Sequence, residues 1–205
     1  MNPAHLLLKD QFQRASQATG LTAPEGVFES LASRYGAPDR AYHTLQHIAE
    51  GLGHLKAVRV VPPEVPVAWW FHDSIYDPRR DDNEEKSAAW AVAVLGKTAL
   101  AGKVKQAILA TKPGAYAADP GARLVVDIDL AILASPEPRF SEYQAQLRRE
   151  QAFVDEANWR RVWLQQLRSY SDRAFIYQTP EFRVLETRAR KNIERVINAM
   201  IVGKK

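Results

Sequence analysis

The chain contains no cysteine among its 205 residues. Disulfide bonds, thiol nucleophiles and zinc–thiolate sites are therefore excluded. The sequence also lacks any apolar run approaching the roughly 20 residues that a membrane-spanning helix requires. Its first residues show no charged leader followed by a long apolar stretch, which argues against a secretory signal. We therefore expect a cytoplasmic protein that does not enter a membrane.

An excess of charge of one sign is missing as well. The chain has 28 basic and 24 acidic residues, and its short basic clusters lie among acidic and apolar residues. A nucleic-acid-binding surface usually concentrates Lys and Arg along one stripe, so the sequence gives no strong indication of a nucleic-acid partner. The hydrophobic share of 46% and the charged share of 25% are typical of a folded globular protein and exclude a disordered chain.

Strand patterns are few, and apolar residues recur at helical spacing along nearly the whole chain. No repeat, low-complexity tract or Gly/Ser linker divides it, so we expect one all-α domain. In residues 122–134 a strand is the alternative, because the segment is rich in β-branched residues. Asp82 and Glu85 are spaced as in a capping box that begins a helix. The expected helices are 3–18, 25–35, 42–57, Pro63 or Pro66 to about Asp77, 83–96, 100–112, 122–134, 139–170 as one helix or a broken pair, and 180–202.

Two histidines lie four residues apart in the segment YHTLQHI, which covers residues 42–48. On a helix this spacing places His43 and His47 on the same face, about one turn apart. Both imidazoles would then reach one cavity. The alternative is a pair of solvated histidines on a surface helix, and the apolar residues Leu45 and Ile48 favour a partly buried one.

His72 and Asp73 follow the apolar segment PVAWWF, residues 66–71. A carboxylate in such surroundings is costly unless it is paired or binds a cation. Imidazole beside carboxylate is a suitable pair of ligands for a divalent metal ion. The alternative is a His–Asp pair that caps the helix near Pro78.

Two further carboxylates, Asp127 and Asp129, lie in the apolar run RLVVDIDLAIL, residues 123–133. On a helix they point about 200° apart, so one helix directs only one of them toward a given metal. The alternative is that one or both are exposed or pair with an arginine of a neighbouring helix.

Taken in order, these segments resemble the ligand set of the HD superfamily of metal-dependent phosphohydrolases, and in particular its small bacterial group of predicted phosphohydrolases. The resemblance covers about residues 25–200 and implies that residues 1–205 form a single HD-type helical bundle. It implies a divalent metal held by His47, His72, Asp73 and Asp129. The segments that carry it are YHTLQHI at 42–48, FHDSIYD at 71–77, DNEEKSA at 82–88, DIDLAIL at 127–133 and the ending at 179–197. One departure is ATKPGAY at 110–116, where the related group is expected to have a histidine.

The segment at 42–48 is also similar to the YH-x-x-x-H signature of the cyclic-nucleotide phosphodiesterases. That similarity implies that His47 binds metal and that His43 is the general acid. The Asp129–Leu130 pair is similar to a ligand segment of the same enzymes and favours Asp129 as the last ligand. Asp127 is then a supporting or alternative ligand.

The acidic residues Glu84 and Asp77 have two readings. Either one could position the attacking water or hold a second metal, whereas the alternative for the acidic run at residues 81–85 is that its charges merely favour the N-terminus of a helix. Basic side chains near the pocket would help to bind substrate, and the candidates are Lys112, Lys86 and Arg190. The shortage of other histidines favours one metal ion, whose mixed ligands suit Mn, Fe, Co, Ni, Zn or Mg.

The expected function is hydrolysis of a small phosphorylated substrate, with nucleotides among the candidates. A metal-bound water of lowered pKa would supply the attacking hydroxide, and His43 would protonate the leaving group. A non-catalytic metal- or nucleotide-binding module is the alternative, and a di-iron oxygenase is a weaker one. A homodimer is a further expectation.

Overall fold

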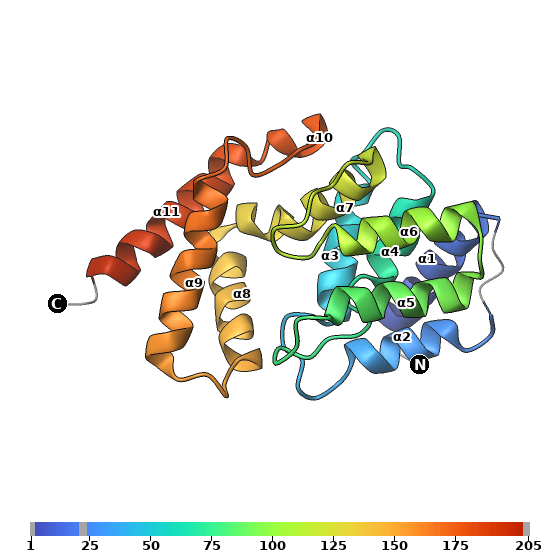
Figure 1. The fold of residues 1–205 in the computed structure, drawn as a ribbon, viewed down its shortest axis with the longest axis horizontal. Coiled ribbons are helices and arrows are strands. Elements are labelled where there is room, and N and C mark those ends of the chain that lie inside the picture. Colours follow the sequence, from blue (N-terminus) through green and yellow to red (C-terminus); the bar gives the residue numbers. More distant parts are fainter. Residues whose placement is uncertain (1–2, 21–23, 203–205) are drawn as a thin grey trace. The chain divides into compact units, whose positions relative to one another are not determined.

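The computed structural model describes residues 3–20 and 24–202 (Figure 1). Over these residues every regular element is a helix, and no strand occurs. The all-α prediction is therefore confirmed. In the ambiguous apolar segment, helix α7 (Pro120–Leu130) is followed by a short 3₁₀-helix, η1 (Ala131–Ala134). None of the described helices is both long and apolar enough to cross a membrane.

The chain divides into two compact units, Met1–Val126 and Asp127–Lys205, and the division falls inside α7. The expected single domain over residues 1–205 stays a prediction. Residues 1–2, 21–23 and 203–205 of that range lie outside the described part of the chain.

Helix α4 (Glu64–Phe71) is the centre of the first unit. All of its residues except Pro66 are buried, and it packs against α1, α3, α5 and α6. A helix that is apolar around its whole circumference belongs in a core, so this position follows from the sequence VPVAWWF. The surrounding helices are α1 (Pro3–Ala18), α2 (Val27–Tyr35), α3 (Leu45–Leu55), α5 (Asn83–Leu95) and α6 (Ala99–Leu109).

Helices α3 and α4 meet at a glycine. A Cβ atom on Gly51 would lie 2.1 Å from the ring of Trp69, so only glycine leaves room for the indole. The Trp69 side chain is fully buried and donates a hydrogen bond from Nε1 to the carbonyl of Ile48, at 2.9 Å. This contact fixes the first half of α3 against the end of α4.

Two predicted helix boundaries are wrong. Helix α3 begins at Leu45, because Thr44 is its N-cap and accepts a hydrogen bond from the backbone of Gln46. His43 therefore lies in a turn, and the helical i, i+4 relation with His47 does not exist. Helix α4 ends at Phe71 rather than near Asp77.

Residues 72–82 form a loop that local hydrogen bonds stabilise. Asn83 accepts from the backbone N–H of Asp77 and donates to its carbonyl, which closes the loop before α5. The predicted capping box is not formed, because the Asp82 carboxylate binds Arg80 and Lys86 instead of the helix backbone.

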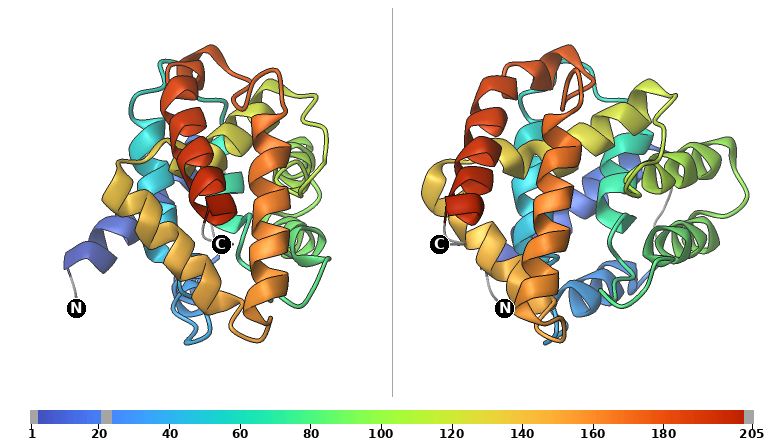
Figure 2. Two further views of the ribbon diagram at one scale, coloured as in Figure 1. Left: turned by 90° about the vertical axis from the view of Figure 1, so that its left-hand side faces the viewer. Right: turned by 60° about the vertical axis from the view of Figure 1, so that its left-hand side comes forward.

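In the second unit, α9 and α11 run side by side (Figure 2). The segment 139–170 is the broken pair, because Asp155 caps α9 through the backbone N–H of Asn158, at 3.0 Å. The predicted single helix over 180–202 is wrong, since it is interrupted at residues 184–185. The helices are α8 (Glu137–Glu150), α9 (Glu156–Ser171), α10 (Pro180–Arg183) and α11 (Glu186–Val202).

We predict that Gly51→Ala lowers the free energy of unfolding by about 1–3 kcal/mol, because the new methyl group overlaps the Trp69 ring. Urea denaturation followed by circular dichroism measures the change. The matched control is Gly53→Ala in the same helix, where an added Cβ meets nothing within 4 Å. Its stability should rise by about 0.5–1 kcal/mol through helix propensity. Equal effects of the two substitutions would contradict the proposed α3–α4 contact.

Candidate metal centre

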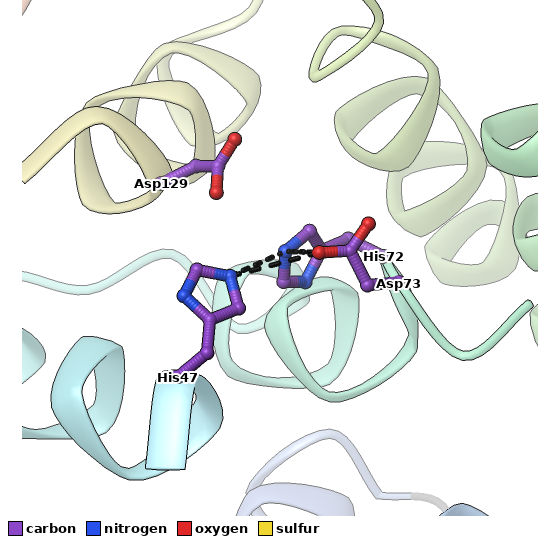
Figure 3. Close-up of side chains that lie close together, drawn as sticks. All are labelled: His47, His72, Asp73 and Asp129. Atoms are coloured by element: carbon purple, nitrogen blue, oxygen red, sulfur yellow. Dashed lines mark hydrogen bonds and ion pairs between the residues drawn. The ribbon is translucent and has the colours of Figure 1, made fainter. Parts of the chain in front are cut away.

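Three ligand atoms converge at the ends of α3 and α4 (Figure 3). The Nε2 atoms of His47 and His72 lie 3.1 Å apart. Asp73 Oδ2 lies 2.9 Å from the Nε2 of His72 and 3.6 Å from that of His47. The two imidazoles are almost fully buried, and the Asp73 side chain is 15% exposed. The fold thus brings together three of the four ligands implied by the resemblance.

The orientation of the His72 ring is fixed by Trp69. His72 Nδ1 lies 2.8 Å from the Trp69 carbonyl, which can only accept a hydrogen bond. Nδ1 therefore carries the proton in the neutral ring, and Nε2 presents its lone pair to the cluster. The indole of Trp69 stacks on the imidazole with ring centres 4.3 Å apart. A carbonyl that accepts from the second ring nitrogen is the usual support of a metal-binding histidine.

The short distance between His72 and Asp73 requires a proton or a cation between their acceptor atoms. A neutral His72 presents a lone pair to a carboxylate oxygen, and two such acceptors repel each other at 2.9 Å unless a proton or a cation lies between them. Ligand atoms bound at about 2.0–2.2 Å to one metal are separated by roughly 3.0–3.5 Å. The observed separations are close to these values, so the three residues fit a single divalent metal ion.

The electrostatics of Asp73 favour its anionic form. Burial by itself raises the pKa of this carboxyl, but the neighbouring His72 and His43 lower it by more. The resulting pKa lies below the usual range of an aspartate. An anionic oxygen beside imidazole nitrogens is a donor set that suits Mn, Fe, Co, Ni or Zn.

Asp129 is the fourth member of the group. One ligand atom each from His47, His72, Asp73 and Asp129 lie within 4.8 Å of one another. The residue belongs to α7, a continuous helix that begins in the first unit.

Asp127 points its carboxylate at a different partner. It is fully buried and accepts hydrogen bonds from the backbone of Gln178 and from the backbone and hydroxyl of Thr179, all at 2.7–3.0 Å. Burial raises its pKa, and these hydrogen bonds only partly oppose that shift. Asp127 therefore holds the chain that leads into α10, which is a structural role beside Asp129.

His43 lies next to the ligands although it is not helical. Its Nε2 is 4.0 Å from Asp73 Oδ2, and its ring centre is 6.0 Å from that of His47. The imidazole stacks on Tyr76, with ring centres 3.9 Å apart, and its side chain is 16% exposed. This position would allow His43 to exchange protons beside a metal ion held by the three neighbouring residues.

The two other acidic candidates differ in their surroundings. Glu84 is half-buried in the first turn of α5; burial raises its pKa, and the negative charge of Asp73 raises it further. Glu84 is thus close enough to Asp73 for their charges to interact. Asp77 Oδ1 instead accepts a hydrogen bond from the backbone of Arg79, at 2.9 Å, and closes a turn of the loop.

The basic candidates already have protein partners. Lys112 Nζ binds the Glu85 carboxylate and donates to the Asp81 carbonyl, at 2.7 Å, beside the first turn of α5. Lys86 pairs with Asp82. The guanidinium of Arg190 binds Glu186 and three backbone carbonyls, of Ser171, Arg173 and Ala174. Arg190 therefore joins α11 to the segment after α9, and its predicted role in substrate binding gains no support.

Three supporting residues were missed by the sequence reasoning. Trp69 orients His72, and Tyr76 stacks on His43. Arg40 donates hydrogen bonds to the backbone carbonyls of His43 and Asp73. Tyr76 lies in the segment FHDSIYD, but no role was assigned to it, and no motif included Arg40, because their contacts join separate loops. The apolar run around Trp69 indicated a core position but not the stack on an imidazole.

Comparison with known proteins adds no identification. No family model matches the chain, and no curated protein or solved structure matches it. Functional inference therefore depends on the geometry of the cluster and on the sequence resemblance.

We predict that the protein binds one equivalent of Co²⁺ or Zn²⁺. Loss of a residue that only hydrogen-bonds to a metal ligand weakens binding by roughly 10–100-fold, and we expect His72→Ala to weaken it by more, because a ligand itself is removed. Isothermal titration calorimetry measures the affinity, and the visible spectrum of Co²⁺ reports its coordination. His54→Ala, which removes another histidine of α3, is the control and should leave both unchanged. Equal affinities of wild type and His72→Ala would refute the site.

The paired substitutions Asp129→Asn and Asp127→Asn should show which carboxylate binds the metal and which one stabilises the fold. We expect the first to weaken Co²⁺ binding with little loss of stability, because it removes an anionic donor. The second should lower the melting temperature and leave the affinity within a few-fold of wild type, because its carboxylate binds Gln178 and Thr179. The reverse pattern would make Asp127 the ligand.

Proposed function

We propose that the protein is a metal-dependent phosphohydrolase of the HD type, acting on a small phosphorylated substrate such as a nucleotide. The observation that carries the proposal is the convergence of a ring nitrogen each from His47 and His72 with a carboxylate oxygen of Asp73, with His43 beside them. The ordered resemblance to HD phosphohydrolases agrees with it. A site that only stabilised the fold would have no use for the additional histidine next to its ligands.

A divalent metal held by His47, His72, Asp73 and Asp129 would supply Lewis acidity toward the phosphoryl oxygens and toward a water molecule. The protein holds these ligands rigid before the substrate arrives. The Trp69 carbonyl keeps His72 in one tautomer, and the buried positions of both imidazoles exclude bulk water from their ring nitrogens. Such preorganisation avoids rearrangement during the reaction.

His43 is the proposed general acid. As water forms a bond to phosphorus, the bond to the leaving oxygen breaks, and that oxygen takes the proton of His43. Imidazole is the side chain most often used for proton transfer near neutral pH. Stacking on Tyr76 restricts the ring to one plane, and its distance of 4.0 Å from Asp73 Oδ2 keeps it near the reacting group.

Glu84 is the proposed partner of the attacking water. Its pKa is raised by burial and by the charge of Asp73, which makes the carboxylate a better proton acceptor than a solvated glutamate. The charge of Lys112 interacts with Glu84, and its ammonium group would bind the substrate phosphate once its ion pair with Glu85 breaks. The substrate-binding role of Lys112 thus remains part of the proposal.

We predict that stripped protein, resupplied in turn with Mn²⁺, Co²⁺, Ni²⁺, Zn²⁺ or Mg²⁺, releases phosphate from a member of a panel of nucleotides and an aryl phosphate. His43→Gln should lower kcat by about 10²–10⁴-fold, the usual contribution of a general acid. Its affinity for Co²⁺ should stay unchanged. His54→Gln is the matched control and should retain full activity.

The contradicting results are distinct. If the wild type binds one metal ion and hydrolyses nothing with any metal, the proposal fails in favour of a non-catalytic metal- or nucleotide-binding module. If His43→Gln retains full activity, hydrolysis stands but the assignment of the general acid falls.

A further inference from the structure

Arg40 joins two turns that are far apart in the sequence. Its Nη1 donates to the carbonyl of His43, at 3.1 Å, and to that of Asp73, at 2.7 Å. Its Nη2 donates to the carbonyl of Ser74, at 3.2 Å. One turn precedes α3 and the other follows α4, so a single guanidinium links the main chain at the proposed proton donor to the main chain at a proposed ligand.

The surroundings hold this guanidinium in place. Arg40 is only 9% exposed, and its charged group lies over the rings of Tyr35 and Tyr76, at 5.1 and 5.6 Å. Tyr76 also stacks on His43, and Tyr35 donates a hydrogen bond to the Trp70 carbonyl in α4. A buried charge is costly unless hydrogen bonds and aromatic faces compensate it. Here both kinds of partner belong to the framework of the metal centre.

We propose that Arg40 is a positioning residue that sets the separation between His43 and Asp73. The inference rests on the proposed metal site and on the proposed role of His43. Arg40 binds the backbone of Asp73, so the carboxylate of that residue remains directed at His72. The same guanidinium holds the His43 turn, which keeps the His43 imidazole beside the ligands and 4.0 Å from Asp73 Oδ2.

Only arginine has the geometry for this task. Its planar guanidinium donates in several fixed directions, whereas lysine offers a compact point charge on a flexible stem. A lysine at this position would satisfy one turn and release the other. Direct binding of substrate by Arg40 is disfavoured, because the side chain is buried and both Nη atoms are directed at carbonyls.

The test uses Co²⁺ as the probe of the centre in the full-length protein. Arg40→Met should weaken Co²⁺ binding by about 10–100-fold, the usual effect of losing a residue that orients ligands, and should shift the visible spectrum. Arg40→Lys should shift the spectrum in the same direction, since charge alone does not rebuild the link. Arg34→Met is the matched control, because Arg34 lies over Trp90 and makes no contact with either turn among the described contacts.

A second control separates positioning from general loss of stability. Leu31→Ala removes a fully buried side chain of α2 and should lower the melting temperature while the Co²⁺ spectrum stays that of wild type. An unchanged spectrum and affinity in Arg40→Met would overturn the inference, and so would full rescue by Arg40→Lys. If Arg40→Met does not fold, Arg40→Lys decides by the same comparison.

Failure of the proposed function gives a different result. If the wild type binds Co²⁺ but releases no phosphate, hydrolysis is refuted while the spectra of the Arg40 variants still decide the positioning role. If the wild type binds no Co²⁺, the metal site and the inference fall together. In an active enzyme, Arg40→Lys should lower kcat more than it changes KM, because the substrate does not contact the guanidinium.

Discussion

The imidazole of His72 has a single orientation in this fold, because its Nδ1–H is bound to the Trp69 carbonyl and its face lies against the Trp69 indole. Its other nitrogen must then face His47 Nε2 and Asp73 Oδ2 at close to 3 Å. The acceptor nitrogen of His72 and the Asp73 oxygen can lie this close in a buried site only when a cation or a proton lies between them. The rest of the centre is arranged around this electrostatic requirement.

Two parts of the fold hold these atoms in place: a buried helix and a pair of turns joined by Arg40. The helix is α4, whose buried circumference anchors Trp69 and hence the ring of His72. The turns are those before α3 and after α4, which local propensity does not define. Arg40 joins these turns through their carbonyls, and Gly51 allows α3 to approach Trp69. Ligand geometry therefore depends on contacts between segments.

Chemical roles divide according to burial. The candidate ligands His47 and His72 are buried, whereas the proposed general acid His43 and the proposed water partner Glu84 are partly exposed, as their proposed roles require. Asp127 and Asp129 show how helical geometry assigns neighbouring carboxylates to different tasks. Because they point about 200° apart, the first can bind the chain before α10 while the second belongs to the ligand group.

The sequence by itself determined the helical class and most helix positions, because hydrophobic periodicity reports local burial. It also singled out the four candidate ligands, because a carboxylate in an apolar run requires a partner and the ordered motifs resemble a known ligand set. It failed where a different local cap or ion pair, or a contact with another segment, replaced the expected pattern. His43 lies in a turn rather than on the helix of His47, Asp82 binds side chains instead of a helix end, and Arg190 holds a loop. The role of Arg40 depends on two turns meeting in space, which only the tertiary structure decides.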